Sequence, residues 1–454
     1  MSKNKEYQKR LHELIPGGAH TYSRGDDQYP SNAPTILEKG KGAYVWDADG
    51  NKFLDYGMGL RSITIGYDYG EISDAAIVEI KKGNNLTRAS VTELKAAELM
   101  ISLFPWAQMV KFGKNGSTVT TAAIKLSRAY TGRKHVAMCA EHPFFTYDDW
   151  FIGTTPMDKG IPQESKSFSH KFHYNNIASL EKIFTENTNQ ISCVILEPAI
   201  FHSPCAECGK KMLEKPHCKT CGNKEKNFLH QVKALCKKNG AVFILDEMIT
   251  GFRWDLHGAM KLYDIEPDLA TFGKGMANGF PLSALIGKKE IMNLGGILEE
   301  GAERVFLIST THGSEMSSLG AFIKAIEVYK RENVIGHLWD YGKKLITGMN
   351  DIAKSLGIGD YFEVTGYPVS PVYITRDKEK NISMEFRTLF SQEMIKGDVL
   401  MPWIALSLMH KEEELKLTLQ ATEKALAIYK KAIDGNVKDY LVGKAIKPVF
   451  RKHN

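Results

Sequence analysis

Two nearby stretches decide the fold: GAVFILDEMITGFR at residues 240–253 and PDLATFGKGMANGFPLSALIG at residues 267–287. In each, a short apolar run ends at a charged residue, Asp246 in the first and Lys274 in the second. Continuous apolar runs of this length are typical of strands that are buried on both faces of a parallel sheet. Ligands bind at the carboxyl ends of such strands, so we expect Asp246 and Lys274 to lie along one binding edge.

Similar apolar runs occur earlier in the chain, at 109–113, 135–140 and 191–198, and helix-compatible stretches separate them. Strands that alternate with helices predict an α/β fold with a large, mainly parallel sheet. Beyond about Ser317 the pattern changes to long helices and then to short mixed elements. The predicted domains are an N-terminal segment at 1–55, a large sheet domain at 56–315 and a smaller C-terminal α+β domain at 316–454.

The composition is that of a globular chain. It has 454 residues, of which 43% are hydrophobic and 25% charged, and a formal net charge of +6 with both signs scattered. That balance is too mild to indicate nucleic-acid binding, and no apolar run reaches the ~20 residues that a membrane span needs. The N-terminal MSKNKEYQKR lacks the apolar segment of a signal peptide, so we expect a cytoplasmic protein without membrane or nucleic-acid partners.

The stretch FGKNGSTVTTAAIKLSRAYTG, residues 112–132, has the chemistry of a phosphate site. Small residues follow a short strand and open a helix, so free backbone N–H groups and the positive end of the helix are aimed at an anion. Gly116, Ser117 and Thr118 form this turn. The alternative interpretation is an ordinary N-terminal cap without a ligand.

Asp246 and Lys274 suit the two ends of a pyridoxal 5′-phosphate (PLP) ring. A buried carboxylate can bind a protonated pyridine nitrogen and so keep the ring an electron sink, although Asp is also a common helix cap. A lysine between Gly273 and Gly275 can move freely and lose its solvation, which favours the neutral amine that attacks an aldehyde. Most lysines are solvated surface charges, so the ordered combination carries the argument.

The chain resembles the class-III aminotransferases, a family of fold-type I PLP enzymes, and within it the glutamate-1-semialdehyde 2,1-aminomutase-like members. The resemblance spans nearly the whole chain, and further motifs carry it in the matching order: IPGGAHTYSR, DADGNKFLDYGMG, VILEP and STTHGSEMSSLGA. It implies a large PLP-binding domain at 56–315 and a homodimer with the active site at the subunit interface.

The resemblance also implies a role for each matching residue. The cofactor phosphate would be bound by the 116–118 turn, and the ring would be enclosed by one side chain on each face. Lys274 would carry the cofactor as a Schiff base and also move the proton. The remaining implied contacts are Gly116, Ser117 and Thr118 with the phosphate, Phe144 and Met248 with the two ring faces, Asp246 with the ring nitrogen, and Thr311 with the phosphate of the neighbouring subunit's cofactor.

Departures from the family pattern bear on the reaction. The usual Glu after the phosphate turn is Val119, and the common YHG motif is FFT at 144–146. Arg24 lies where aminomutases bind a substrate carboxylate, for which a guanidinium is suited; the alternative is a surface arginine, and Arg61 is a weaker second candidate. These departures favour an aminotransferase, which moves an amino group between a donor and an aldehyde or ketone. The alternatives are a 2,1-aminomutase, which needs no second substrate, and a non-catalytic zinc-bearing binding protein.

An insert at 203–224 contains CAECGKKMLEKPHCKTCGN. Cys205, Cys208, Cys218 and Cys221 form two CxxC pairs, the spacing of knuckles that coordinate a structural zinc through four thiolates. Redox cysteines and an iron–sulfur cluster are the alternatives. The other three cysteines lie in apolar or helical runs, and we expect them in the core: Cys139, Cys193 and Cys236.

Overall fold

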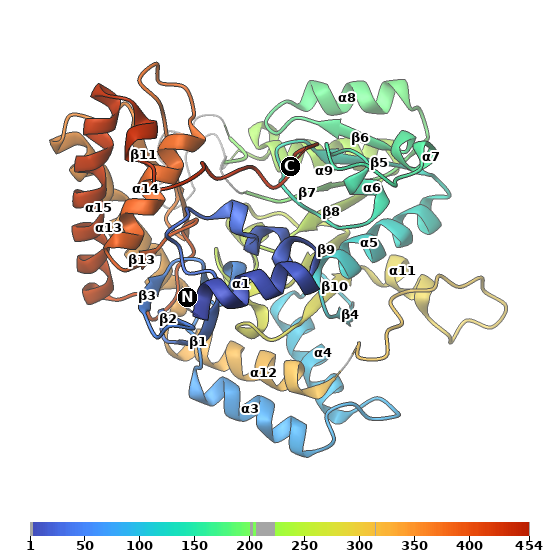
Figure 1. Ribbon diagram of the computed structural model, residues 1–454. Helices are drawn as coiled ribbons and strands as arrows, with labels where there is room; N and C mark the ends of the chain where they lie inside the picture. Colours follow the sequence, from blue (N-terminus) through green and yellow to red (C-terminus); the bar gives the residue numbers. More distant parts are fainter. Residues whose placement is uncertain (1–2, 200–202, 206–222, 314, 454) are drawn as a thin grey trace. The chain divides into compact units, whose positions relative to one another are not determined.

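The computed structural model describes residues 3–199, 203–205, 223–313 and 315–453. The chain forms two compact units (Figure 1). One contains the residues up to Tyr69 together with Gly336–Arg451, and the other contains Gly70–Ile335 with the residues from Lys452. Within the described residues, no helix has both the length and the apolar character to cross a membrane.

The larger unit is built on a seven-stranded sheet. Strand β10 is antiparallel to both of its neighbours, and the other described strands of this sheet run in one direction. The residues of the central strands β7, β8 and β9 are all buried, as the continuous apolar runs predict. The α/β fold with a mainly parallel sheet is therefore confirmed. Across the sheet the order is β4 (Met109–Gly113), β10 (Ser283–Gly287), β9 (Leu269–Phe272), β8 (Val242–Asp246), β7 (Ile191–Leu196), β5 (His135–Cys139) and β6 (Ser169–Phe172).

Helices connect and cover these strands. Helix α5 shows how the sequence specifies one of them: Asn115 caps its first turn, an apolar face with Val119 and Leu126 is buried, and Gly132 ends it with a left-handed φ of 67°. Figure 1 shows α3, α4 and α12 as neighbouring helices. The helices are α3 (Gly70–Lys81), α4 (Val91–Leu103), α5 (Gly116–Thr131), α6 (Asp149–Ile152), α7 (Gln163–Ser167), α8 (Ile177–Glu186), α9 (Phe228–Asn239), α10 (Ala259–Leu262), α11 (Lys289–Met292) and α12 (Met316–Arg331).

The smaller unit combines two small sheets with long helices. A tight turn at Asp49-Gly50 joins β2 to β3, with Gly50 at a φ of 90°. One sheet has the order β1 (Leu37–Lys41), β2 (Tyr44–Asp47), β3 (Lys52–Asp55) and β13 (Val399–Leu400), and the other pairs β11 (Phe362–Tyr367) with β12 (Ser370–Thr375). The helices are α1 (Lys3–Leu14), α2 (Met58–Arg61), α13 (Val334–Ser355), α14 (Met384–Lys396) and α15 (Glu412–Asp434).

The compact units do not begin where the predicted domains begin. Residues 56–69 belong to the smaller unit, because Asp55 continues from β3 into a turn that it binds through Gly57 N–H at 2.7 Å. Helix α12 belongs to the larger unit, because it packs on α3, α4 and the turn that follows Lys274. The boundaries expected at 55/56 and 315/316 differ from this division and, as limits of functional domains, stay a prediction.

Candidate active site

Lys274 lies two residues after the end of β9 at Phe272 and begins the short 3-10 turn Lys274–Ala277. Its φ is 31°, in the left-handed region that side chains with a Cβ rarely adopt. The N–H of Met276 closes the turn by donating to the Gly273 carbonyl at 2.8 Å. Such a conformation costs roughly 1–3 kcal/mol and persists only where the surrounding structure imposes it, which is common at functional sites.

Asp246 ends β8, the strand beside β9, and its side chain is 1% exposed. Its Oδ1 accepts two hydrogen bonds, from the Thr271 hydroxyl at 2.8 Å and from the Met248 N–H at 3.1 Å. Burial raises the pKa of the carboxyl, while the Thr271 hydrogen bond and the charge of Lys274 act to lower it. The two predicted residues are thus close enough to interact, and the buried carboxylate would be stabilised by a cationic partner such as a protonated pyridine nitrogen.

Glu247, which follows Asp246 in the chain, has a different structural role. Glu247 is fully buried and accepts the N–H groups of Ala259 at 2.9 Å and Met260 at 2.7 Å, as well as the Thr250 hydroxyl. Burial raises the pKa of Glu247 to about 7. Because both of its oxygens bind backbone amides, Glu247 holds the chain that follows β8, while Asp246 occupies the strand end.

The phosphate turn is formed where β4 leads into α5. Asn115 Oδ1 accepts the Thr118 N–H at 2.9 Å and the Thr118 hydroxyl at 3.1 Å, so this side chain caps the helix. Ser117 is buried, and its Oγ accepts the Tyr147 N–H at 3.2 Å. The amides of Gly116 and Ser117 belong to the first helical turn, whose N–H groups have no acceptor within the helix. They are the donors that an anion would use.

Met248 brings the phosphate turn and the lysine together. A Cβ built on Gly116 would lie 3.0 Å from Met248 Cε, and one built on Gly273 would lie 2.3 Å from Met248 Sδ. Gly273 has an extended φ of −177°, so steric exclusion is what requires glycine there. Helix α5, the Met248 side chain and the backbone that carries Lys274 therefore meet at one place on the carboxyl edge of the sheet.

Two further predicted cofactor contacts have exposed side chains. Phe144 is 47% exposed and packs edge to face on Phe151, with ring centroids 5.7 Å apart, whereas Phe145 is buried. Thr311 is exposed, and its carbonyl accepts the Asn85 side-chain amide at 3.2 Å. Val119, which replaces the family's glutamate, is fully buried. The roles implied for Phe144 and Thr311 stay predictions.

The candidate substrate arginines belong to the smaller unit. Arg24 is exposed at the end of the short turn Tyr22–Arg24. Arg61 is half-buried and donates to the Ser370 hydroxyl at 2.6 Å. A substrate-binding role for Arg24 stays a prediction.

Of the four predicted zinc ligands, only Cys205 is described, and it is buried. Cys208, Cys218 and Cys221 lie outside the described residues. In the part of the chain that the structure describes, no group of three or more His, Cys, Asp or Glu side chains could hold a metal ion. The predicted core positions of Cys139, Cys193 and Cys236 are confirmed, because all three are buried.

Two pairs near strand ends were not expected from the sequence. The Glu197 N–H, after β7, donates to His142 Nδ1, after β5, at 2.9 Å, and burial lowers the pKa of His142 to about 3. This histidine is therefore neutral, with its proton on Nε2. Lys114, beside the phosphate turn, forms an ion pair with Glu315. The sequence signal that could have found these residues is their position: three follow strands, and Glu315 directly precedes a helix.

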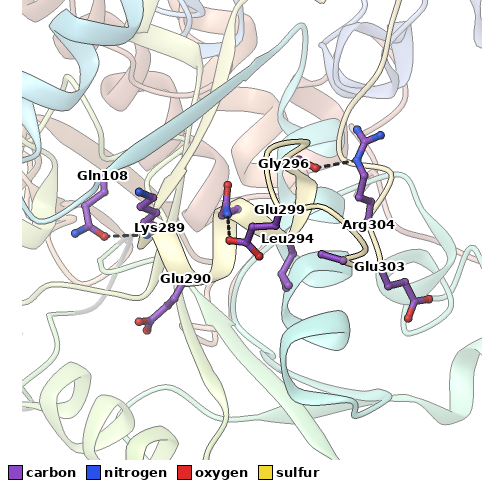
Figure 2. Close-up of a pocket in the computed structure, with 10 residues that line it drawn as sticks. Gln108, Lys289, Glu290, Leu294, Gly296, Glu299, Glu303 and Arg304 are labelled. Atoms are coloured by element: carbon purple, nitrogen blue, oxygen red, sulfur yellow. Dashed lines mark hydrogen bonds between the residues drawn. The ribbon is translucent and has the colours of Figure 1, made fainter.

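A separate pocket of about 430 Å³ lies away from this site. Figure 2 shows Lys289, Glu290, Glu299 and Arg304 around it. It adjoins Gln108, whose N–H donates to the Gly287 carbonyl at 3.0 Å. Because β10 is antiparallel, its last residue Gly287 lies at the amino edge of the other strands, opposite Lys274. The residues predicted to carry the chemistry therefore lie at the carboxyl edge, opposite this pocket.

Comparison with known proteins identifies the family. The aminotransferase class-III family matches residues 26–361, and the 3-aminobutyryl-CoA aminotransferase of Cloacimonas acidaminovorans (strain Evry) is 31% identical over 425 residues, which are 93% of this chain and 96% of that protein. The chain belongs to the class-III aminotransferases and is a PLP-dependent aminotransferase.

Solved structures agree with the fold. The FumI protein of Sphingopyxis sp. MTA144, in its PLP internal aldimine form, superposes with a TM-score of 0.82 at 24% identity, covering 95% of this chain and 98% of that one. A glutamate-1-semialdehyde aminomutase from Pseudomonas aeruginosa PAO1 gives a TM-score of 0.77 at 16% identity, covering 94% of each chain. Both show the fold-type I architecture.

Proposed function

We propose that PLP binds at the carboxyl edge of the larger sheet, with Lys274 as its covalent attachment and Asp246 at its ring nitrogen. The observation that carries this proposal is the meeting of three elements at Met248: the first turn of α5, the end of β8 and the residue before Lys274. The buried Asp246 carboxyl, whose pKa burial raises, fits a cationic ring nitrogen, and the N–H groups that open α5 fit a phosphate.

When bound, PLP supplies an electron sink for the carbanion that amino transfer requires. The Gly116 and Ser117 amides orient the phosphate, and Asp246 holds the proton on the ring nitrogen. Lys274 would hold the cofactor covalently, and its amine would take the proton from the substrate carbon that carries the amino group. Phe144 and Met248 would enclose the two ring faces and exclude water.

The donor and acceptor are an amine and an aldehyde or ketone. The relative named 3-aminobutyryl-CoA aminotransferase makes β-amino acyl compounds sensible donors to test beside glutamate. Arg24 would bind a substrate carboxylate. A 2,1-aminomutase remains the alternative, and it is distinguished by turnover of a single substrate without an added acceptor.

A homodimer is supported by an apolar surface on the larger unit. Val78, Leu86, Val91 and Leu94, from α3, α4 and the loop between them, are each at least half exposed. Exposed apolar surfaces of this kind often mark interfaces. Asn85, in the same loop, binds the segment that contains Thr311. A second copy on this surface would place Thr311 near the subunit boundary, as its implied role requires.

We propose a structural zinc at Cys205, Cys208, Cys218 and Cys221, supported by their paired CxxC spacing. The described residues at the start of the insert, Ser203 and Pro204, are attached to the larger unit. Asn175 donates to the Ser203 carbonyl at 2.9 Å, and Phe228 N–H donates to the Pro204 carbonyl at 3.0 Å. The knuckle would thus be anchored beside β7. A cytoplasmic location, which would keep these thiols reduced, stays a prediction.

The absorption spectrum of the protein with PLP tests the site. We expect a visible band that is lost in Lys274→Ala and bleaches on addition of an amino donor, with a matching keto product. Lys289→Ala, an exposed lysine, is the matched control and should keep the band. An unchanged band in Lys274→Ala would refute the proposed attachment.

A further inference from the structure

Tyr329 reaches from α12 to the turn that carries Lys274. Its hydroxyl donates to the carbonyl of Gly275, the residue that follows Lys274, at 2.7 Å. The Tyr329 side chain is 3% exposed and lies near the C-terminal end of the helix. This bond joins α12 to the Gly275–Met276 peptide unit, one residue beyond the lysine.

The turn needs such a contact because its backbone is strained. Lys274 has a φ of 31°, and Asn278, which ends the turn, has a φ of 46°. Within the turn, the hydrogen bond from Met276 N–H to Gly273 O closes one side. The Gly275 carbonyl, at the other end of the same Gly275–Met276 peptide unit, accepts the Tyr329 hydroxyl. Without the Tyr329 hydroxyl, this peptide unit keeps only the bond on its N–H side, and the left-handed conformation of Lys274 loses a constraint.

Tyr329 is itself held rigidly. Its ring packs near Phe252, with centroids 6.4 Å apart. Arg253, fully buried, lies close enough that Tyr329 influences it: burial lowers the pKa of Arg253 to about 10, and the tyrosine acts in the opposite direction. The helix packs on α3 and α4. Tyr329 therefore presents its hydroxyl from a fixed position.

We infer that Tyr329 is a positioning residue for the reaction, acting through the Gly275 carbonyl to aim the Lys274 amine. The inference rests on the proposed role of Lys274. The same amine must reach the cofactor aldehyde and then the substrate proton, and small misplacements of a reacting group lower rates steeply. Binding of the amino donor does not involve the hydrogen bond between Tyr329 and Gly275. Loss of this bond should therefore lower kcat and leave the KM for the donor unchanged.

Tyr329→Phe tests it, because the substitution removes one hydroxyl and keeps the ring. In the apoprotein, we expect PLP addition to Lys274 to slow about 10-fold, and in the loaded enzyme kcat to fall about 10- to 100-fold with donor KM unchanged. The pH midpoint of the visible band should shift by about one unit, because the environment of the lysine nitrogen changes.

Tyr373→Phe is the matched control. Tyr373 is also buried, and its hydroxyl also donates to a backbone carbonyl, that of Met401 at 3.1 Å. Both variants should lose similar thermal stability, and the control should keep the band midpoint and kcat. Equal kinetic and spectral behaviour of the two variants would overturn the inference. A band that survives in Lys274→Ala would instead overturn the proposed function, so the two failures are distinguishable.

Discussion

Lys114 and Glu315 form an ion pair between the residue that precedes the phosphate turn and the N-cap of α12. The same carboxylate accepts the Ser318 N–H at 2.9 Å and hydroxyl at 3.0 Å. Burial acts to raise the pKa of Glu315, but hydrogen bonds from Lys114, Ser317 and Ser318 outweigh it and hold this pKa below its usual range. The Glu315 side chain thus caps α12 and holds Lys114, the residue next to the proposed phosphate turn.

Glu315→Gln should destabilise the protein by about 1–3 kcal/mol at pH 7, because Lys114 loses its charged partner in a largely buried place. The depressed folded pKa means that the stabilisation is present above the unfolded value of about 4.3 and is lost as pH falls through the folded pKa. Urea unfolding of the wild type and of Glu315→Gln measures the destabilisation at pH 7 and its loss below pH 4. Glu412→Gln, which breaks an exposed pair with Lys344, should cost less than about 1 kcal/mol.

Glu247 should make the apoprotein less stable as pH rises. Its folded pKa of about 7 lies above the unfolded value of about 4.3, so its stabilisation is complete below the unfolded value and is lost as pH rises through 7. The difference is on the order of 3 kcal/mol. Glu247→Gln should lower the overall stability, because the Gln side-chain NH₂ would face a backbone N–H. It should also flatten the dependence of stability on pH, because Gln does not titrate. An unchanged slope between pH 5 and 8 contradicts this assignment.

Gly273→Ala should disturb the proposed cofactor site through a steric collision and not through backbone strain. The added methyl would collide with Met248 Sδ, and overpacking of this kind costs about 1–3 kcal/mol. We expect PLP affinity to fall about 10-fold or more, and Gly273→Ala combined with Met248→Ala to recover part of it. Gly70→Ala is the control, since its Cβ would meet nothing within 4 Å. PLP titration by absorbance measures all four proteins.

The apolar surface on α3 and α4 should be needed for assembly. Leu94→Glu places a charge at a side chain that is 59% exposed in the single chain. If a second copy covers it, the variant should elute as a monomer in size-exclusion chromatography with light scattering and lose cofactor affinity. Ile382→Glu, at an exposed position on the smaller unit, is the control. A dimer that tolerates Leu94→Glu places the interface elsewhere.

The purified protein should contain one zinc per chain. Elemental analysis should find it in the wild type and find it strongly reduced in Cys218→Ser, because a tetrathiolate site loses one of four ligands. Cys236→Ser, a buried cysteine outside the insert, should keep the metal. Iron in place of zinc, or no metal in any variant, would reject the structural zinc.

The cofactor motifs were accessible from the sequence because each is local. Each motif lies within a few positions of the chain. One apolar run is followed by Asp246, and the other is followed by Gly273 and Lys274, so each pattern predicts both a strand and the residue at its end. Residues 115–118 predict the start of a helix in the same way. Local patterns of this kind do not specify partners: they did not separate the task of Glu247 from that of Asp246, which depends on the amides of Ala259 and Met260.

The sequence by itself determined the α/β class, the alternation of strands and helices, and the residues at the strand ends, because apolar periodicity and glycine-rich turns act over short distances. Only the tertiary structure decided that Met248 packs between Gly116 and Gly273, that Lys274 is left-handed, and that Lys114 pairs with Glu315 across 201 residues. These contacts arise from the order of strands in the sheet, which joins segments that no periodicity relates.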